Sequence, residues 1–271
     1  MLEDQQIGFI GGGAMAEALV RGILKVSLVA PSQIMVADVS NERLEYLASQ
    51  YQVGVSNETL DLAKKVNVLF LTVKPQVINE VLDTIAPVVA KSTVVVSVAA
   101  GVTLATLQGK MPGVPIIRVM PNTPVAVSSG MSALALGKYA SPQIGEMVST
   151  ILASVGKVVT VGEELMDAVT GLSGSGPAYA FMLIDALSDA GVRVGFSRQT
   201  ALLLAAQTLF GAAKMVLETG QHPAQLRDMV TSPGGTAITG VHVLEQNGVR
   251  AALIDAVVAA TNRSREMGKK G

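Results

Sequence analysis

A glycine-rich turn near the start of the chain constrains the fold most strongly. An apolar run over residues 7–10 is followed by three glycines and then by a helical pattern over Ala14–Lys25. Gly11, Gly13 and Ala16 fit the G-x-G-x-x-G/A spacing. In it, the first glycine permits the turn, the second lets a pyrophosphate approach the backbone, and the small third residue lets helix and strand pack closely. Free N–H groups at the helix start would face the phosphates, so we predict a dinucleotide-binding turn.

Hydrophobic patterns divide the chain into two parts. Strand-like segments at 33–37, 53–55, 68–73, 93–99, 116–120, 131–136 and 157–161 alternate with helical segments at 42–50, 59–65 and 77–89. The runs 68–73 and 93–99 are almost continuously apolar, which is typical of parallel strands buried on both faces. Beyond Gly162 the patterns are helical, at 165–172, 177–190, 198–218, 223–230, 236–246 and 249–267. We therefore predict an α/β protein, with a Rossmann-type doubly wound parallel sheet over residues 1–162 and an all-helical domain over 163–271.

The composition limits the partners. Only 15% of the residues are charged and the mean hydropathy is +0.47, so a membrane or a subunit interface is needed to cover apolar surface. The most apolar helical run, 201–216, contains Gln207 and Lys214 and is shorter than the roughly 20 residues that span a bilayer. We interpret it as a buried or intersubunit helix and expect no membrane partner.

Charge and cysteine content exclude further classes. A net charge of −1 without a basic stripe gives no footprint for nucleic acid. The chain has no cysteine, which excludes disulfides and thiolate chemistry. Glu3 and Asp4 precede the first apolar run where a signal peptide would be basic, so we expect a cytoplasmic enzyme.

Ligands of open parallel sheets collect beyond the carboxyl ends of the strands. The loops there are 11–13, 38–41, 72–75 and 98–101, and together they would line one cleft. Asp38, at the end of the second strand, is placed to bind a ribose diol and to repel a 2′-phosphate, although it could instead cap the next helix. Ser40, Asn41 and Arg43 would hold that phosphate, so both NADH and NADPH stay open.

The helical part contains two glycine-rich interruptions, at 171–177 and 231–236. In the first, Pro177 suits an early helical position and Ser175 a cap. The second also ends at a helix start, where Ser232, Thr236 and bare N–H groups would suit a small carboxylate. Both interruptions could instead be plain turns between helices.

The titratable groups are few. His222 in a turn and His242 in a helix are interpreted as structural, and no metal-ligand cluster is expected. Reduction of a carbonyl usually needs a positioned proton donor, whereas a protonated C=N group is already electrophilic. A nicotinamide site poor in acids and bases therefore favours an imine substrate.

The chain resembles the Δ1-pyrroline-5-carboxylate reductases over essentially its whole length. The likeness is strongest in Val73-Lys74-Pro75, in residues 99–103, 120–124, 171–179 and 212–215, and in 226–245 with its central Ser-Pro-Gly-Gly. It implies a Rossmann domain and a helical domain that interlocks with a second subunit, giving homodimers that can assemble into decamers. It also implies hydride transfer from NADPH or NADH to the imine carbon of 1-pyrroline-5-carboxylate, which becomes C5 of the L-proline formed in this last biosynthetic step.

The resemblance implies roles for individual residues. The cofactor would contact Ile10, Gly11, Gly12, Gly13, Ala14, Met15, Asp38, Asn57, Thr72, Val73, Lys74, Pro75, Val98, Ala99, Ala100 and Asn122. The substrate would contact Glu163, Ser232, Pro233, Gly234, Gly235, Thr236 and Ala237. Thr236 would be the catalytic residue. Many members have threonine at the second position after the paired glycines, whereas this chain has Thr236 at the first and Ala237 at the second.

Two alternatives compete with this interpretation. A β-hydroxyacid dehydrogenase-like oxidoreductase would carry a catalytic lysine about one helical turn after a glycine-rich loop, but the helix after Gly176 begins Pro-Ala-Tyr-Ala-Phe-Met. A nucleotide-sensing or scaffold protein would bind the cofactor without turnover. The intact Ser-Pro-Gly-Gly loop argues against it.

Overall fold

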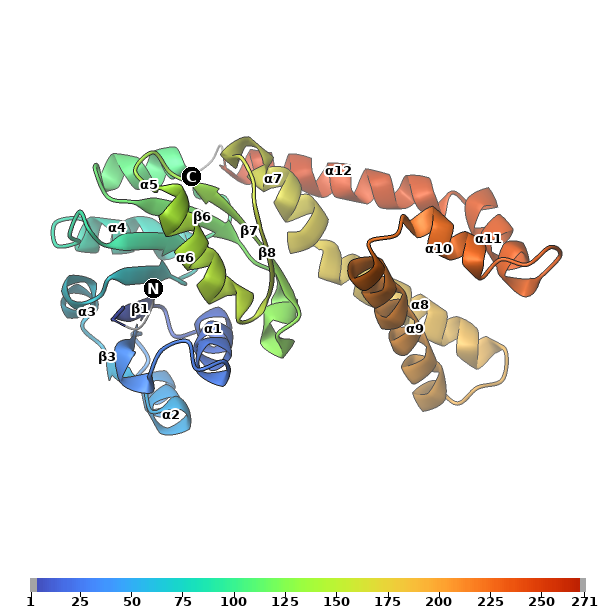
Figure 1. The fold of residues 1–271 in the computed structure, drawn as a ribbon, viewed down its shortest axis with the longest axis horizontal. Helices are drawn as coiled ribbons and strands as arrows, with labels where there is room; N and C mark the ends of the chain where they lie inside the picture. Colours follow the sequence, from blue (N-terminus) through green and yellow to red (C-terminus); the bar gives the residue numbers. More distant parts are fainter. Residues whose placement is uncertain (1–3, 269–271) are drawn as a thin grey trace. The chain divides into compact units, whose positions relative to one another are not determined.

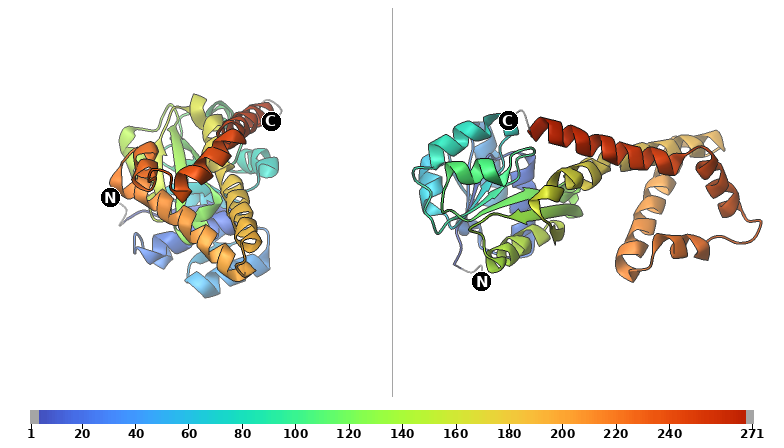
Figure 2. Two further views of the ribbon diagram at one scale, coloured as in Figure 1. Left: turned by 90° about the vertical axis from the view of Figure 1, so that its right-hand side faces the viewer. Right: turned by 90° about the horizontal axis from the view of Figure 1, so that it is seen from above.

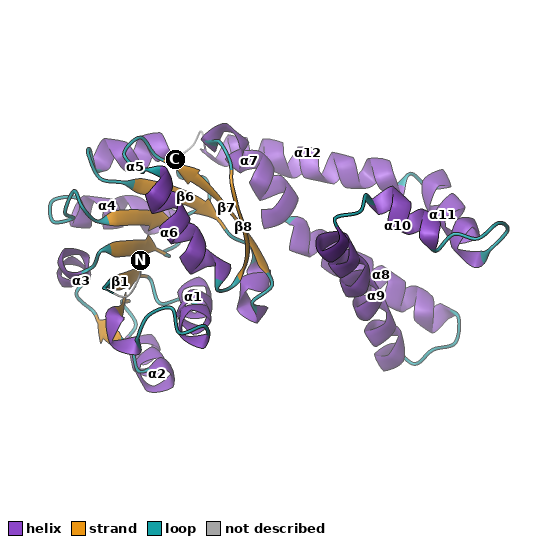
Figure 3. Cartoon of the chain, viewed as in Figure 1, coloured by secondary structure: helices purple, strands orange, loops and turns teal. Residues whose placement is uncertain are grey.

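The computed structural model describes residues 4–268. Contacts divide the chain into two compact units. The first runs to Gly174 and includes the end of the chain from Ala260, and the second is Ser175–Ala259. Within the described residues, the strands all lie in the first unit, and the second is built of helices and loops (Figure 3).

An eight-stranded sheet forms the centre of the first unit, in the order β3-β2-β1-β4-β5-β6-β7-β8. The strands are β1 (Ile7–Ile10), β2 (Ile34–Ala37), β3 (Gly54–Ser56), β4 (Val68–Leu71), β5 (Val94–Ser97), β6 (Ile116–Met120), β7 (Gly130–Leu136) and β8 (Gly156–Thr160). Strands β1 to β6 are parallel, and the order reverses between β1 and β4. The predicted doubly wound α/β fold is therefore confirmed. One pair departs from it, because β7 runs antiparallel to β6.

Helices cover both faces of this sheet (Figures 1 and 2). On one face lie α1 (Ala14–Lys25), α2 (Asn41–Tyr51) and α6 (Pro142–Ala153), and on the other lie α3 (Thr59–Lys65), α4 (Ile78–Ile85) and α5 (Leu104–Lys110). Successive side chains of a strand point to opposite faces. Phe9 and Phe70 accordingly stack at 5.0 Å between ring centroids on the α1 side, while Leu69 and Leu71 pack on the α4 side.

Among the helices that cover the sheet, three differ clearly from the sequence-based expectation. Helices α5 and α6 were not predicted, although Thr103 and Ser141 cap them by accepting hydrogen bonds from Thr106 N and Ile144 N. Helix α4 ends at Ile85, before the predicted residue 89, because Pro87 has no backbone N–H with which to continue the helical hydrogen bonds. A 3-10 turn, Pro75–Val77, precedes α4.

The first unit is completed by the 3-10 turns Pro31–Gln33, Thr123–Val127 and Glu163–Leu165, by α7 (Met166–Val169) and by a π-helical turn, Thr170–Gly174. The end of the last helix also belongs to this unit. There Ser264 Oγ donates a hydrogen bond of 2.7 Å to Asp167 Oδ1.

The second unit contains α8 (Gly176–Arg193), α9 (Arg198–Thr219), α10 (Pro223–Met229) and α11 (Thr236–Gln246). It also holds the first part of α12 (Val249–Gly268). Helices α8 and α9 pack closely, because a Cβ added at Gly191 would lie 2.7 Å from the Cβ of Ala201.

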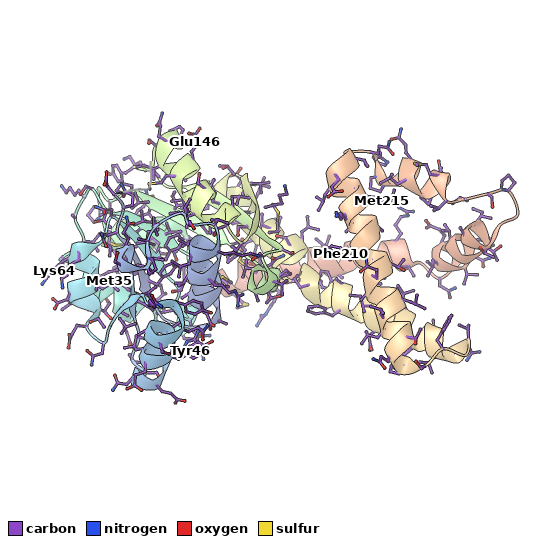
Figure 4. All side chains as sticks on the ribbon, turned by 60° about the horizontal axis from the view of Figure 1, so that its bottom comes forward. Met35, Tyr46, Lys64, Glu146, Phe210 and Met215 are labelled. Atoms are coloured by element: carbon purple, nitrogen blue, oxygen red, sulfur yellow. The ribbon has the colours of Figure 1, made fainter. Side chains whose placement is uncertain are left out.

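Helix α9 carries much of the exposed apolar surface. It has 22 residues and is the one helix among residues 4–268 that is long and apolar enough to cross a membrane. Only 11% of an apolar 18-residue stretch of this helix is buried. The full helix is longer than the run 201–216, so the length argument against a membrane does not apply to it. Phe210 and Met215, both on α9 (Figure 4), are 58% and 45% exposed.

Candidate active site

The glycine turn after β1 has room for a phosphate. Gly11 has φ +97°, and a Cβ there would lie 2.9 Å from the backbone of Thr72. Gly13 is the N-cap residue of α1, and no atom lies within 4 Å of a Cβ built on it. Among the described residues, no side chain caps α1. These features fit a dinucleotide pyrophosphate at the helix start.

Thr72, the residue that follows β4, holds this turn in place through hydrogen bonds. Its hydroxyl lies 2.7 Å from Gly11 O and 3.0 Å from Ile10 O, and it donates to these carbonyl oxygens. Its backbone N–H also donates to Ile10 O at 2.9 Å.

Parallel strands β2, β1, β4 and β5 are neighbours in the sheet. The predicted cofactor residues that follow them, at 10–15, 38, 72–75 and 98–100, therefore share one edge. Asn57 follows β3 at the same edge and is exposed.

Asp38 ties the ribose loop to the glycine turn. Its Oδ2 accepts a 2.6 Å hydrogen bond from Gly12 N, and its Oδ1 accepts one of 2.9 Å from Ser40 N. Ser40 rather than Asp38 caps α2, accepting from Arg43 N at 3.3 Å. Val39, between them, is 98% exposed. The sequence analysis did not single out Val39. The feature that could have drawn attention to it is an apolar residue inside an otherwise polar loop.

Arg43 is held by partners on three sides. Its Nε donates to Gly12 O at 2.5 Å, its Nη2 pairs with Glu17, and its guanidinium lies 5.0 Å from the ring centroid of Tyr46. Glu17 also accepts hydrogen bonds from Tyr51 at 2.8 Å and Tyr46 at 3.0 Å. Glu17 and its tyrosine partners were not found from the sequence.

These contacts shift two pKa values. Burial raises the pKa of Glu17, but the hydrogen bonds from Arg43, Tyr51 and Tyr46 outweigh it, so the pKa lies below its usual value. Burial and the hydrogen bond to Glu17 raise the pKa of Tyr51 to about 12. Glu17 is therefore ionised and Tyr51 protonated at neutral pH.

Glu163 contacts a buried cation. Its Oε1 accepts hydrogen bonds from Leu104 N at 2.5 Å and from Arg118 Nη1 at 3.3 Å. The Arg118 side chain is 7% exposed and that of Glu163 is 33% exposed. The carboxylate thus joins the start of α5 to β6.

Asn122 follows β6 and connects two segments. Its Oδ1 accepts from Met131 N at 2.8 Å, and its Nδ2 donates to Ser173 O at 3.0 Å. The cofactor role predicted for Asn122 stays a prediction, and these bonds give it a structural one.

The loop before α11 presents the exposed start of a helix. Gly234 has φ +68°, and Gly235, the N-cap residue, donates from its N–H to Ser232 O at 3.0 Å. Within residues 4–268 no side chain caps α11. Ser232 and Thr236 are both exposed. The loop belongs to the second unit and Glu163 to the first, so their joint contact with one substrate stays a prediction.

Of the other residues considered, His222 has the expected structural role. It caps α10, its Nδ1 accepting from Ala224 N at 3.2 Å. Ser175 occupies the N-cap position of α8, but its side chain makes no capping hydrogen bond. In the described part of the chain, no group of three His, Asp or Glu residues is arranged to hold a metal ion.

A doubly wound sheet with an open glycine turn and an acidic residue after β2 is typical of the dinucleotide-binding domain of nicotinamide-dependent oxidoreductases. Residues 6–101 match the family model for NADP oxidoreductases that are coenzyme F420-dependent, and residues 163–267 match the model for pyrroline-5-carboxylate reductase dimerisation. The chain belongs to the pyrroline-5-carboxylate reductase family.

Relatives named pyrroline-5-carboxylate reductase are similar over nearly the whole chain. The protein from Methanosarcina acetivorans is 46% identical, covering 99% of this chain and 100% of its own length. The one from Synechocystis is 48% identical, covering 98% and 99%. A solved structure of the reductase from Coxiella burnetii has a TM-score of 0.93 at 36% identity, covering 97% of this chain and 98% of its own. A Plasmodium falciparum reductase solved with NADP bound has a TM-score of 0.87 at 31% identity, covering 98% and 99%.

Proposed function

We propose that the N-terminus of α11 binds the substrate carboxylate in this reductase. The chain reduces 1-pyrroline-5-carboxylate to L-proline with NAD(P)H. The observation that carries the carboxylate site is the uncapped helix start behind Gly234 and Gly235. Its N–H groups and the positive end of the helix dipole favour an anion. Ser232, Pro233, Gly234, Gly235, Thr236 and Ala237 make up the site, and Glu163 is proposed to complete it.

The cofactor is proposed to bind along the carboxyl edge of the sheet. The glycine turn and the start of α1 would hold the pyrophosphate, Asp38 the adenosine ribose, and residues 72–75 and 98–100 the nicotinamide half. The nicotinamide would supply a hydride to the imine carbon of the substrate, the atom that is C5 in the product proline. The remaining residues orient the substrate and hold its ring nitrogen, which ends as the secondary amine of proline.

Thr236 is the group that we assign to the ring nitrogen. Its hydroxyl lies in the first turn of α11, next to the N–H groups proposed for the carboxylate. Ala237 cannot take this role because its side chain is a methyl group. The substrate imine carries its own electrophilicity when protonated, so one hydroxyl that orients the nitrogen is sufficient.

The helical part is proposed to form the dimer interface, with a domain boundary near residue 162. The match of residues 163–267 to a dimerisation model supports this assignment. So do exposed apolar side chains on α8 and α9, among them Phe181 (63%), Leu203 (69%) and Leu217 (72%). Exposed apolar patches of this kind mark interaction sites. Assembly of the homodimers into decamers follows from the resemblance.

We place the protein in the cytoplasm and assign it neither a membrane nor a nucleic-acid partner. A second copy of the chain would cover α9, and the net charge of −1 offers no attraction to phosphate backbones.

Steady-state kinetics test the function. The purified protein is expected to oxidise NADPH or NADH when given 1-pyrroline-5-carboxylate, and amino-acid analysis should detect proline in an amount equal to the cofactor consumed. Turnover of 3-hydroxy acids alone would favour the dehydrogenase alternative, and cofactor binding without turnover would favour a sensor.

A further inference from the structure

Glu17 is placed to control a cation beside the cofactor loop. It lies on α1, while Arg43, Tyr46 and Tyr51 lie on α2 and all three donate hydrogen bonds to its carboxylate. The side chains of Arg43 and Glu17 are only 27% and 19% exposed. Figure 4 shows Tyr46 on α2.

Arg43 and Asp38 both form hydrogen bonds with Gly12 of the glycine turn. Asp38 accepts from Gly12 N and Arg43 donates to Gly12 O. Asp38 is the residue proposed to bind the adenosine ribose. Because Asp38 and Arg43 both bind Gly12, the Arg43 guanidinium lies close to this proposed contact. A ribose 2′-phosphate would seek a cation of this type, because arginine binds phosphate through paired N–H donors.

The ion pair with Glu17 reduces the positive charge and the number of free N–H donors that Arg43 can offer to such a phosphate. One Nη group is committed to a carboxylate that is ionised at neutral pH, and the local charge of the pair sums to zero. A phosphate that approached would have to displace or share this carboxylate, and it would be repelled by it.

We propose that Glu17 is a specificity-determining residue for the cofactor: it holds the Arg43 guanidinium against α1, weakens binding of the 2′-phosphate of NADPH and shifts the enzyme toward NADH. Glu17 acts through Arg43 and is a positioning residue. The inference rests on the proposed position of the adenosine ribose beside Asp38.

The test compares binding of the two cofactors by calorimetry and turnover with each. In Glu17→Gln the charge is lost while the shape is kept. We expect the Kd of NADPH to fall at least about tenfold, the equivalent of one charge-assisted hydrogen bond. The Kd of NADH should change less than about twofold, because NADH lacks the 2′-phosphate. A ratio of the two constants that stays within twofold in a folded Glu17→Gln protein overturns the inference.

Two controls separate the mechanism from simple packing. In the double variant Glu17→Gln with Arg43→Gln the gain should vanish, since it passes through Arg43. Tyr51→Phe removes another hydrogen bond to Glu17 but leaves the ion pair, so the ratio should stay as in the parent protein. A gain that persists without Arg43, or that Tyr51→Phe reproduces, contradicts the proposal.

Asp38→Ser distinguishes this inference from the proposed site itself. If Asp38→Ser shifts the ratio and Glu17→Gln does not, the inference fails and the site stands. If neither substitution shifts it, the adenosine ribose does not bind beside Asp38, and both fail.

Discussion

The hydroxyl of Thr72 donates to the carbonyl oxygen of Gly11 over 2.7 Å, across two neighbouring strands. It thereby fixes the one residue of the glycine turn whose φ is +97° and whose missing Cβ makes room for the Thr72 backbone. The two residues are 61 positions apart in the sequence. The shape of the phosphate-binding turn thus depends on β4 as well as on its own glycines.

Thr72→Val is expected to loosen the turn. The change keeps the side-chain shape and removes one donor, so the free energy of unfolding should fall by about 1 kcal/mol. The KM for both cofactors should rise by roughly fivefold, the equivalent of about 1 kcal/mol. Thr84→Val is the matched control, because the Thr84 hydroxyl donates to Glu80 O on the exposed face of α4. Equal effects of the two substitutions on the cofactor KM would contradict this role.

Asp38→Ser is expected to shift preference toward NADPH. Loss of the carboxylate removes repulsion of the 2′-phosphate, and the ratio of kcat/KM values for NADPH and NADH should rise about tenfold. The variant also loses the bonds to Gly12 N and Ser40 N, so its unfolding free energy should fall by about 1–2 kcal/mol. An unchanged ratio in Asp38→Ser, together with a shifted ratio in Glu17→Gln, would show that residues 40–43 set the choice instead.

Glu163→Gln is expected to destabilise the first unit. Arg118 is buried and would lose its carboxylate partner. Because Glu163 is one-third exposed, part of this loss is screened by water, and we expect the free energy of unfolding to fall by about 2 kcal/mol. Chemical denaturation measures this change. Lys110→Met is the control at the exposed pair with Asp83, and it should cost less than about 0.5 kcal/mol. Similar costs at the two pairs would mean that the Arg118 pair is no more than a surface ion pair.

The sequence allowed the sheet and most helices to be predicted because their signals are local. Helix α3 and helix α11 begin and end at the predicted residues, and the apolar runs in β4 and β5 indicated their burial. The direction of β7 could not be predicted, since it depends on which neighbour the strand pairs with. The caps at Thr103 and Ser141 were local signals that were overlooked.

The candidate site was predicted less completely. Loops that end parallel strands must share an edge, so Asp38 and Thr72 could be grouped from topology alone. The ion pair of Glu17 with Arg43 joins residues 26 positions apart on two helices. No spacing rule connects such positions, because their contact depends on how α1 and α2 pack on the sheet.

Phe210→Glu is expected to disrupt the proposed dimer. A carboxylate in an apolar interface loses its contact with water. The free-energy cost of a glutamate at this position is therefore far larger in the dimer than in the monomer, where the side chain is exposed. Light scattering after gel filtration should show a mass near the 27.9 kDa chain for the variant and at least twice that for the parent. Tyr139→Glu, at an exposed residue of the first unit, should leave the mass unchanged. An unaltered mass for Phe210→Glu would place the interface elsewhere.

Thr236→Val should lower turnover. The change keeps the shape of the side chain and removes the hydroxyl assigned to the ring nitrogen. We therefore expect kcat to fall by about tenfold or more and the Kd of the cofactor to stay unchanged. Thr239→Val is the control on the same helix, because the Thr239 hydroxyl already donates to Gly235 O. If kcat and the substrate KM are both unaffected in Thr236→Val, Thr236 only begins the helix.

A crystal structure of the protein with proline and a nicotinamide nucleotide tests the central claim most directly. The account predicts that the proline carboxylate accepts hydrogen bonds from the N–H groups of Thr236 and Ala237, and that ring atom C5 faces the nicotinamide at the carboxyl edge of the sheet. Proline bound away from residues 232–237, or far from the nicotinamide, would contradict it.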